Sequence, residues 1–179
     1  MFKLLAIVAL IILFGFIINK VLSMSSGLGQ KQPFVIMSPF RAKLLNRGEP
    51  IKNASVTLRY SWNSGSEDDR AGHIKEYKSD AEGIVDIPAI EREIFVSNVQ
   101  KTASNYSLSV TVNGVKNEFH TVSKSNPLMH GELEQELTGL ICDIDAPWMM
   151  VENPDAKGSS LFGTKCEWPD RKSLKFEEL

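Results

Sequence analysis

The sequence has few of the residues from which catalytic and metal sites are built. Its 179 residues include three histidines and two cysteines. His73, His120 and His130 are too dispersed for the His-x-x-x-His spacing that binds a metal ion from one helix, and no Gly-x-Ser-x-Gly motif marks a nucleophilic serine. We therefore expect a protein that is not an enzyme and uses no cofactor or metal ion. We interpret the histidines as solvated polar side chains, with His120 on the outer face of its strand.

An excess of basic charge is also missing. The chain has 20 basic and 22 acidic residues and a formal net charge of −2. Lys3 and Lys20 are the charged residues of positions 1–23, so the remainder has a net charge of −4. A mildly acidic surface does not attract nucleic acid or an anionic membrane. We expect no nucleic-acid partner.

One long apolar run is present, at residues 4–18, between Lys3 and Asn19-Lys20. This layout is typical of a secretory signal peptide or an N-terminal membrane anchor. The run is shorter than the roughly 20 residues that span a bilayer, but residues 2–22 suffice if both lysines extend to the membrane surface. Both alternatives stay open. In either case we expect a protein that is periplasmic, anchored in the inner membrane, or secreted.

Two cysteines, Cys142 and Cys166, lie close to the C-terminus. An even pair in an exported chain predicts a disulfide. The bond would close a loop of about 25 residues and contribute about 3 kcal/mol to stability.

Apolar and polar residues alternate along most of the remaining chain, as in Val56, Leu58, Tyr60 and Trp62. Side chains two apart share one face of a strand, so each such run predicts a half-buried strand. Asn113-Gly114 between Val112 and Val115 predicts a hairpin turn. We expect strands at residues 34–37, 40–45, 56–62, 74–78, 84–87, 94–99, 106–112, 115–122 and 140–144.

Strands this short and this regularly spaced predict an all-β fold, an antiparallel Ig-like or prealbumin-like β-sandwich of about seven strands. The expected order is an apolar leader helix at 1–23, a linker at 24–33, the sandwich at 34–145 and an irregular tail at 146–179 tied by the disulfide. One helical turn could include Leu133 and Leu137.

Residues 46–58, Asn-Arg-Gly-Glu-Pro-Ile-Lys-Asn-Ala-Ser-Val-Thr-Leu, resemble the G-x-P-(V/I)-x-x-A-x-V start of carboxypeptidase-regulatory-like modules. Residues 79–88, Ser-Asp-Ala-Glu-Gly-Ile-Val-Asp-Ile-Pro, are similar to their T-D-x-x-G-x-(Y/F)-x-(F/I)-P hairpin, with Ser79 in place of the usual threonine. The resemblance covers about 50 residues. It implies a prealbumin-like, non-catalytic module, as in small bacterial envelope proteins.

Two groups of residues are candidates for partner binding. Glu67, Asp68 and Asp69 lie in a polar, glycine-bearing loop at residues 63–72, which would connect strands at one end of the sandwich. Trp148 and Trp168 lie in the tail, near Met149, Met150 and Phe162. Tryptophan and methionine are enriched at interface cores. Alternatively, the tail aromatics cover an open edge of the sandwich.

Asp143 and Asp145 could share one face of a strand and bind calcium or act as acid and base. No third oxygen donor accompanies them at a defined spacing, so we expect neither role.

These observations favour a non-enzymatic envelope protein that binds another protein. Its most specific form is an immunity protein, which blocks the active site of a secreted antibacterial toxin. A carbohydrate-binding or surface-adhesion module is the alternative, and a hydrolase with an unrecognised site is the third hypothesis.

Overall fold

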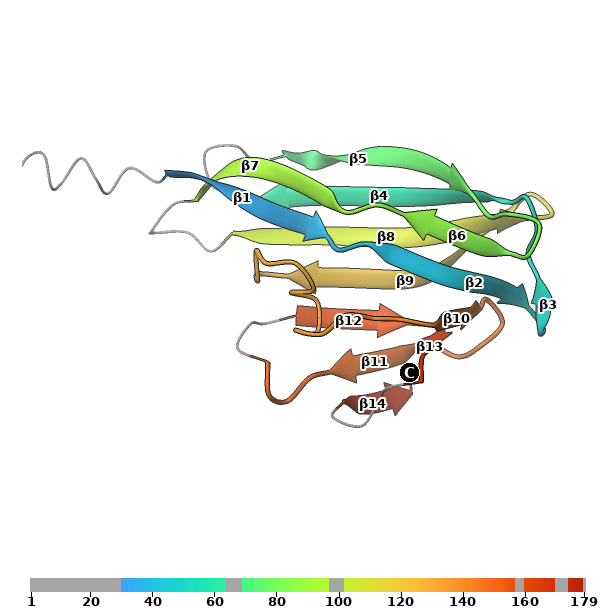
Figure 1. Ribbon diagram of the computed structural model, residues 1–179. Coiled ribbons are helices and arrows are strands. Elements are labelled where there is room, and N and C mark those ends of the chain that lie inside the picture. Colours follow the sequence, from blue (N-terminus) through green and yellow to red (C-terminus); the bar gives the residue numbers. More distant parts are fainter. Residues whose placement is uncertain (1–29, 64–68, 97–101, 157–159, 170–173, 179) are drawn as a thin grey trace, which may run out of the picture.

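The computed structural model describes residues 30–63, 69–96, 102–156, 160–169 and 174–178, which form an all-β fold (Figure 1). Because no helix occurs among these residues, none of them forms a helix that could cross a membrane. The leader predicted at residues 1–23 lies outside the described residues.

The larger sheet has seven strands in the order β14-β11-β12-β9-β8-β4-β5. All its neighbouring strands are antiparallel. The long strands at its centre are those in which the sequence alternates most clearly. The strands are β4 (Ser55–Asn63), β5 (Asp69–Lys78), β8 (Ala103–Val112), β9 (Val115–Lys124), β11 (Met149–Glu152), β12 (Ser160–Thr164) and β14 (Lys175–Glu178).

A second layer lies over this sheet, as Figure 1 shows for β1, β7, β2 and β6. It consists of the antiparallel pair β1-β7 and a five-stranded sheet in which β2 pairs with β3, β6 and β10, and β10 pairs with β13. The β2-β10 pair is parallel. The strands are β1 (Gln30–Met37), β2 (Phe40–Asn46), β3 (Glu49–Pro50), β6 (Ile84–Ile87), β7 (Ile90–Val96), β10 (Leu140–Asp143) and β13 (Cys166–Glu167).

The core lies between the two layers. In β4 the inward positions are Val56, Leu58 and Tyr60, and all three are buried. Leu44 of β2 and Ile36 of β1 are buried in the same core cluster. The alternation in the sequence therefore predicted the buried face of these strands correctly.

Two tight turns have the backbone conformation that their local sequence predicts. Asn113 and Gly114 both have positive φ, 52° and 78°, as a two-residue hairpin requires. Gly83 has a φ of 82°, and a Cβ there would lie 3.0 Å from the carbonyl oxygen of Leu44. Glycine is required at position 83 because its backbone approaches β2 so closely.

The C-terminal region differs from the irregular tail that we expected. β11, β12 and β14 extend the larger sheet beyond β9. Val151 and Phe162 are buried, whereas Met150 and Gly163 alternate with them on the opposite face. Strands of four or five residues, separated by prolines, are too short to reveal their alternation in the sequence.

Two further boundaries also differ. β1 begins at Gln30, so the expected linker at 24–33 already contributes to a strand. Leu133 and Leu137 do not share a helical turn, because residues 128–135 form turns and bends, although Leu133 is fully buried.

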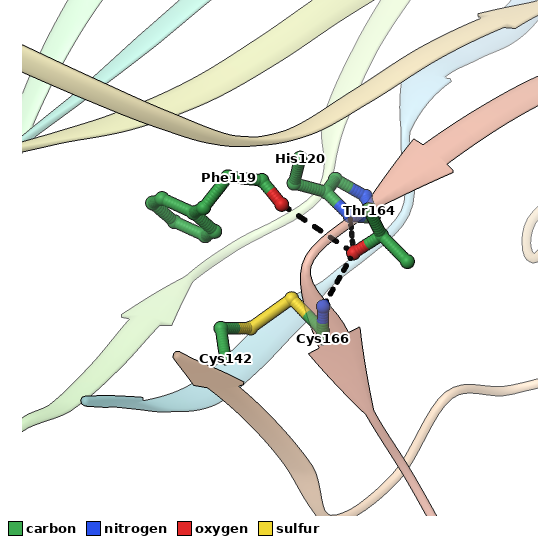
Figure 2. The surroundings of a disulfide bond; sticks show 5 residues. All are labelled: Phe119, His120, Cys142, Thr164 and Cys166. Atoms are coloured by element: carbon green, nitrogen blue, oxygen red, sulfur yellow. Dashed lines mark hydrogen bonds between the residues drawn. A yellow bond between two sulfur atoms is a disulfide. The ribbon is translucent and has the colours of Figure 1, made fainter. Parts of the chain in front are cut away.

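The predicted disulfide between Cys142 and Cys166 is confirmed (Figure 2). The two cysteines are direct partners in the β10-β13 pair and both are buried. The backbone N–H of Cys166 donates to Oγ1 of Thr164, which also lies 3.1 Å from Nδ1 of His120. The bond links β13 to β10 in the sheet that contains β2.

Candidate binding groove

Three of the candidate partner-binding residues, Asp69, Trp148 and Trp168, lie in the part of the chain that the structure describes, and they are not brought together. Glu67 and Asp68 lie outside the described residues, and Asp69 begins β5 at one edge of the larger sheet, opposite Trp62. Trp148 directly precedes β11, near the other edge. Asp69 and Trp148 therefore do not belong to a single site.

Trp168 lies in the core rather than on the surface. Only 5% of it is exposed, and its ring packs between Phe162 and Phe176, with centroids 6.1 and 5.7 Å away. Trp168 therefore fits the alternative in which the tail aromatics cover part of the sandwich, and not the one in which they bind a partner. Trp148 is half-buried and has Nζ of Lys165 5.8 Å from its ring centroid.

His120 is buried and not solvated, so our prediction for it was wrong. The register shifts in β9, where Leu108 pairs with His120 and Ser109 with Glu118. Phe119 is the extra residue of this bulge, and a bulge changes the alternation of side chains. His120 is 1% exposed as a result. Burial lowers the pKa of its imidazole to about 4, against a smaller opposing effect of Glu132.

A buried ion pair lies close to His120. Nζ of Lys124 is 2.9 Å from Oε1 of Glu132, and both side chains are almost fully buried. The backbone N–H and the hydroxyl of Ser38 donate to the two carboxylate oxygens, at 2.9 and 2.6 Å. Burial alone would raise the pKa of Glu132, but Lys124 and Ser38 hold it below its ordinary value. The carboxylate is therefore ionised in the folded protein.

This ion pair holds a segment without regular structure, residues 125–139, against the two layers. The backbone N–H of Val35 donates to the carbonyl of Pro127, and Ser160 Oγ donates to the carbonyl of Glu132. Asn153 Nδ2 donates to the carbonyl of Leu133. These hydrogen bonds fix the segment to several strands, even though the segment itself forms no strand.

The end of this segment forms one wall of a groove on the outer face of β2 and β10. The groove has a volume of about 470 Å³. Ile141, which is 46% exposed, lies beside Lys43 in the parallel pair, and Ile84 is the partner of Lys43 on the other side. The lining residues are Pro39, Arg41, Ala42, Lys43, Ile84, His130, Glu136, Leu137, Thr138, Gly139, Leu140 and Ile141.

A small cavity of about 20 Å³ lies beneath the groove. Pro39, His130 and Leu137 line both spaces, so they form the wall between them. The other residues of the cavity come from both layers and include most of the buried polar cluster: Ser38, Phe40, Tyr106, His120, Glu132 and Gln135.

The opposite surface of the molecule, the outer face of the larger sheet, has a row of mostly polar residues beside the exposed side chains of Ile74 and Leu161. Consecutive cross-strand partners there are Ile74, Arg59, Ser107, Thr121 and Gly163. A shallow hollow of about 300 Å³ lies over the first four. Gly163 has no side chain that could cover the neighbouring Trp148. A Cβ at position 163 would lie 3.6 Å from the ring of Trp148. Trp148 therefore borders this polar row.

The Asp143 carboxylate has a structural role. It accepts hydrogen bonds from the backbone N–H groups of Arg47, Gly48 and Asp145. Burial opposes ionisation of Asp143, but these bonds lower its pKa. Asp145 is bound by Arg47 Nε at 2.6 Å. Within the described ranges, no three acidic, histidine or cysteine side chains are grouped so that they could hold a metal ion.

Sequence reasoning missed the buried polar cluster. One signal for it was present: Lys124 occupies an inward position of β9, two residues after Val122. A charge at an inward position predicts a buried partner of opposite sign. Nothing in the sequence identifies Glu132 as that partner, because it lies in a segment without periodicity.

A family model described as "Domain of unknown function (DUF6795)" matches residues 40–147. This range includes all groove residues except Pro39, but it excludes Trp148 and Gly163. No curated protein matches the chain, and no solved structure matches it.

Proposed function

The chain belongs to the family described as "Domain of unknown function (DUF6795)", and we propose that it is a non-enzymatic binding protein that docks another protein in the groove beside β2 and β10. The observation that carries this proposal is an exposed, largely apolar groove whose wall is fixed in place by a buried ion pair. A pre-formed site avoids the entropic cost of ordering a loop during binding. The groove also lies within the part of the chain that the family shares.

The composition of the groove fits a protein partner. Ile141, Leu137 and Ile84 offer apolar surface, with Lys43 between Ile141 and Ile84, and Arg41 and Glu136 add charges of opposite sign. Protein interfaces typically combine an apolar core with a polar rim. In its most specific form, the partner is a secreted antibacterial toxin and this chain is its immunity protein.

The proposed compartment is extracytoplasmic, in the periplasm, on the inner membrane or outside the cell. The apolar run at residues 4–18 supports export, and the disulfide supports an oxidising environment. For the fold, we propose a prealbumin-like sandwich. The two-layer arrangement and the turns at Gly48 and Gly83 support this, together with the resemblance at residues 46–58 and 79–88.

Docking in the groove can be tested with a matched pair of charge substitutions. Ile141→Asp places a carboxylate at the centre of the groove, and Leu161→Asp places one on the outer face of the larger sheet, where Leu161 is 66% exposed. A protein recovered from the native envelope by the wild type should bind Ile141→Asp roughly tenfold or more weakly, since a central anchor contributes above 1 kcal/mol. The Leu161→Asp affinity should stay within about twofold.

Equal affinities of these two variants in surface plasmon resonance would place the contact elsewhere. Recovery of no protein at all would contradict the proposed function.

The polar row favours a second candidate, binding of a carbohydrate. Arg59, Ser107 and Thr121 offer hydrogen-bonding groups on a flat face, and Trp148 borders them with an aromatic ring. Retention on a polysaccharide column that is lost in Trp148→Ala and kept in Ile141→Asp would support this candidate over the groove.

Export can be tested through the oxidation state of the cysteines. In whole cells quenched with acid and alkylated, mass mapping should find Cys142 bridged to Cys166 in the full chain. Deletion of residues 2–22 should leave both thiols alkylated, because the cytoplasm keeps thiols reduced. A bridged pair in the truncated chain would contradict export as the source of the disulfide.

A further inference from the structure

We infer that the groove beside β2 and β10 receives a segment of the partner in which an acidic side chain lies between apolar ones, and that its carboxylate pairs with Lys43. The inference rests on the proposed function, because it specifies the chemistry of the protein segment that docks in the groove. Lys43 then decides which segments the groove accepts.

Lys43 lies within the apolar part of the groove. Its strand β2 lies between β6 and β10, and its cross-strand partners are Ile84 and Ile141. Cross-strand partners share one face of a sheet, with Cβ atoms typically about 4.5–5.5 Å apart. All three side chains line the groove. A positive charge therefore stands between two isoleucines on a surface that a docked partner covers.

This charge has no counter-ion in the described part of the chain, where the side chain of Lys43 forms neither an ion pair nor a hydrogen bond. Arg41 differs, because its Nη1 lies 3.7 Å from Oδ2 of Asp86. Glu136 also lines the groove, but it forms no ion pair with Lys43. Lys43 is exposed, so water solvates its ammonium group in the free protein.

Docking changes the surroundings of this ammonium group. A partner that covers Ile84 and Ile141 displaces water from the lysine between them, and a buried ammonium without a counter-ion strongly opposes binding. A carboxylate balances the charge and accepts charge-assisted hydrogen bonds from Nζ. An amide or a hydroxyl also accepts a hydrogen bond, but it leaves the charge uncompensated. Apolar side chains next to the carboxylate contact the two isoleucines, so the matching segment is acidic at its centre and apolar on both sides.

Two tripeptides of the same shape test the role of charge. They are Leu-Asp-Leu and Leu-Asn-Leu, each acetylated at its N-terminus and amidated at its C-terminus. We expect the full chain to bind Leu-Asp-Leu about tenfold more tightly at low salt, because a hydrogen bond to a charged group is stronger than one to a neutral group. The difference should decrease as salt is raised. NMR titration of the methyl signals of Ile84 and Ile141 and the Cε signal of Lys43 measures both affinities and locates the peptide.

Two lysine variants complete the test. Lys43→Met keeps an unbranched side chain without the charge, so it should bind both peptides equally. It should also bind Leu-Asn-Leu at least as tightly as the wild type does, because no ammonium group loses its water. Lys116→Met is the control, because Lys116 is an exposed lysine of β9 that does not line the groove, and it should keep the preference for Leu-Asp-Leu.

Three results would overturn the inference. The first is equal binding of the two peptides by the wild type, and the second is no binding of either peptide at millimolar concentration. The third is a preference for Leu-Asp-Leu that Lys43→Met retains, since the carboxylate would then pair with another cation.

The outcome is separable from that of the proposed function. Loss of partner binding in Ile141→Asp, together with equal binding of the two peptides by the wild type, would remove the acidic contact and keep the docking site. A preference for Leu-Asp-Leu that depends on Lys43, with no protein recovered from the envelope, would keep the carboxylate site and remove the proposed protein ligand.

Discussion

Replacing Glu132 by alanine should lower the free energy of unfolding by about 3–5 kcal/mol, because it leaves the ammonium group of Lys124 buried without its counter-ion. The backbone N–H and the hydroxyl of Ser38 lose their acceptors in the same substitution. The carboxylate is also one of several groups that hold segment 125–139 in position. Urea denaturation of the purified protein, followed by tryptophan fluorescence, measures the change.

The control for this prediction removes both charges together. A variant with Lys124→Met and Glu132→Leu has no buried ion, so it should recover much of the stability that Glu132→Ala loses. Lys124→Met alone should be less harmful than Glu132→Ala, since Ser38 continues to satisfy the carboxylate. A Glu132→Ala variant as stable as the wild type would show that the pair does not hold the segment in place.

Acidification from pH 6.5 to pH 4 should lower the free energy of unfolding by about 2.5 kcal/mol through His120 alone. Burial lowers its pKa in the folded state to about 4 from the ordinary 6.5. Between these values the unfolded chain binds a proton that the folded chain does not. The contribution of His120 is therefore complete above pH 6.5 and declines as the pH falls toward 4.

His120→Phe is the matched variant for the pH dependence. It keeps the ring between Phe40 and Phe162, so it should fold, and it should lack this share of the slope between pH 6.5 and pH 4. Glu132 has a lowered pKa, so its contribution is lost only as the pH falls below its ordinary value of 4.5, and the slope above that value reports His120. Identical slopes for wild type and variant in urea titrations would contradict the assignment to His120.

The parts of the fold that the sequence predicts are those with strong local signals. Alternation identified the central strands β4, β8 and β9, and Asn113-Gly114 marked their hairpin. The cysteine pair was also predictable from its number and context. The short strands β11 and β12 were not, because their position depends on pairing with β9 and not on their own residues.

The groove was less predictable than the fold. Its floor joins β2 to β10, and its wall is a segment with no periodicity, so the residues meet only through tertiary structure. The bulge at Phe119 limited the prediction from sequence in the same way, here for the single residue His120. One extra residue in β9 places His120 in the core and not on the expected outer face. A rule based on the alternation of side chains cannot predict that shift.

The parallel pairing of β2 with β10 has a consequence for the order in which the molecule is assembled. Arg47 and Asp143, which are bound to each other at the end of this pair, are 96 residues apart in the chain. Contacts of such sequence separation form late, because a long loop must close before they contribute. The hairpins of the larger sheet can form while the chain is still emerging, but the groove must wait until Ile141 has been added. A chain halted before residue 140 would thus already contain most of its β-structure and still have no place to bind a partner.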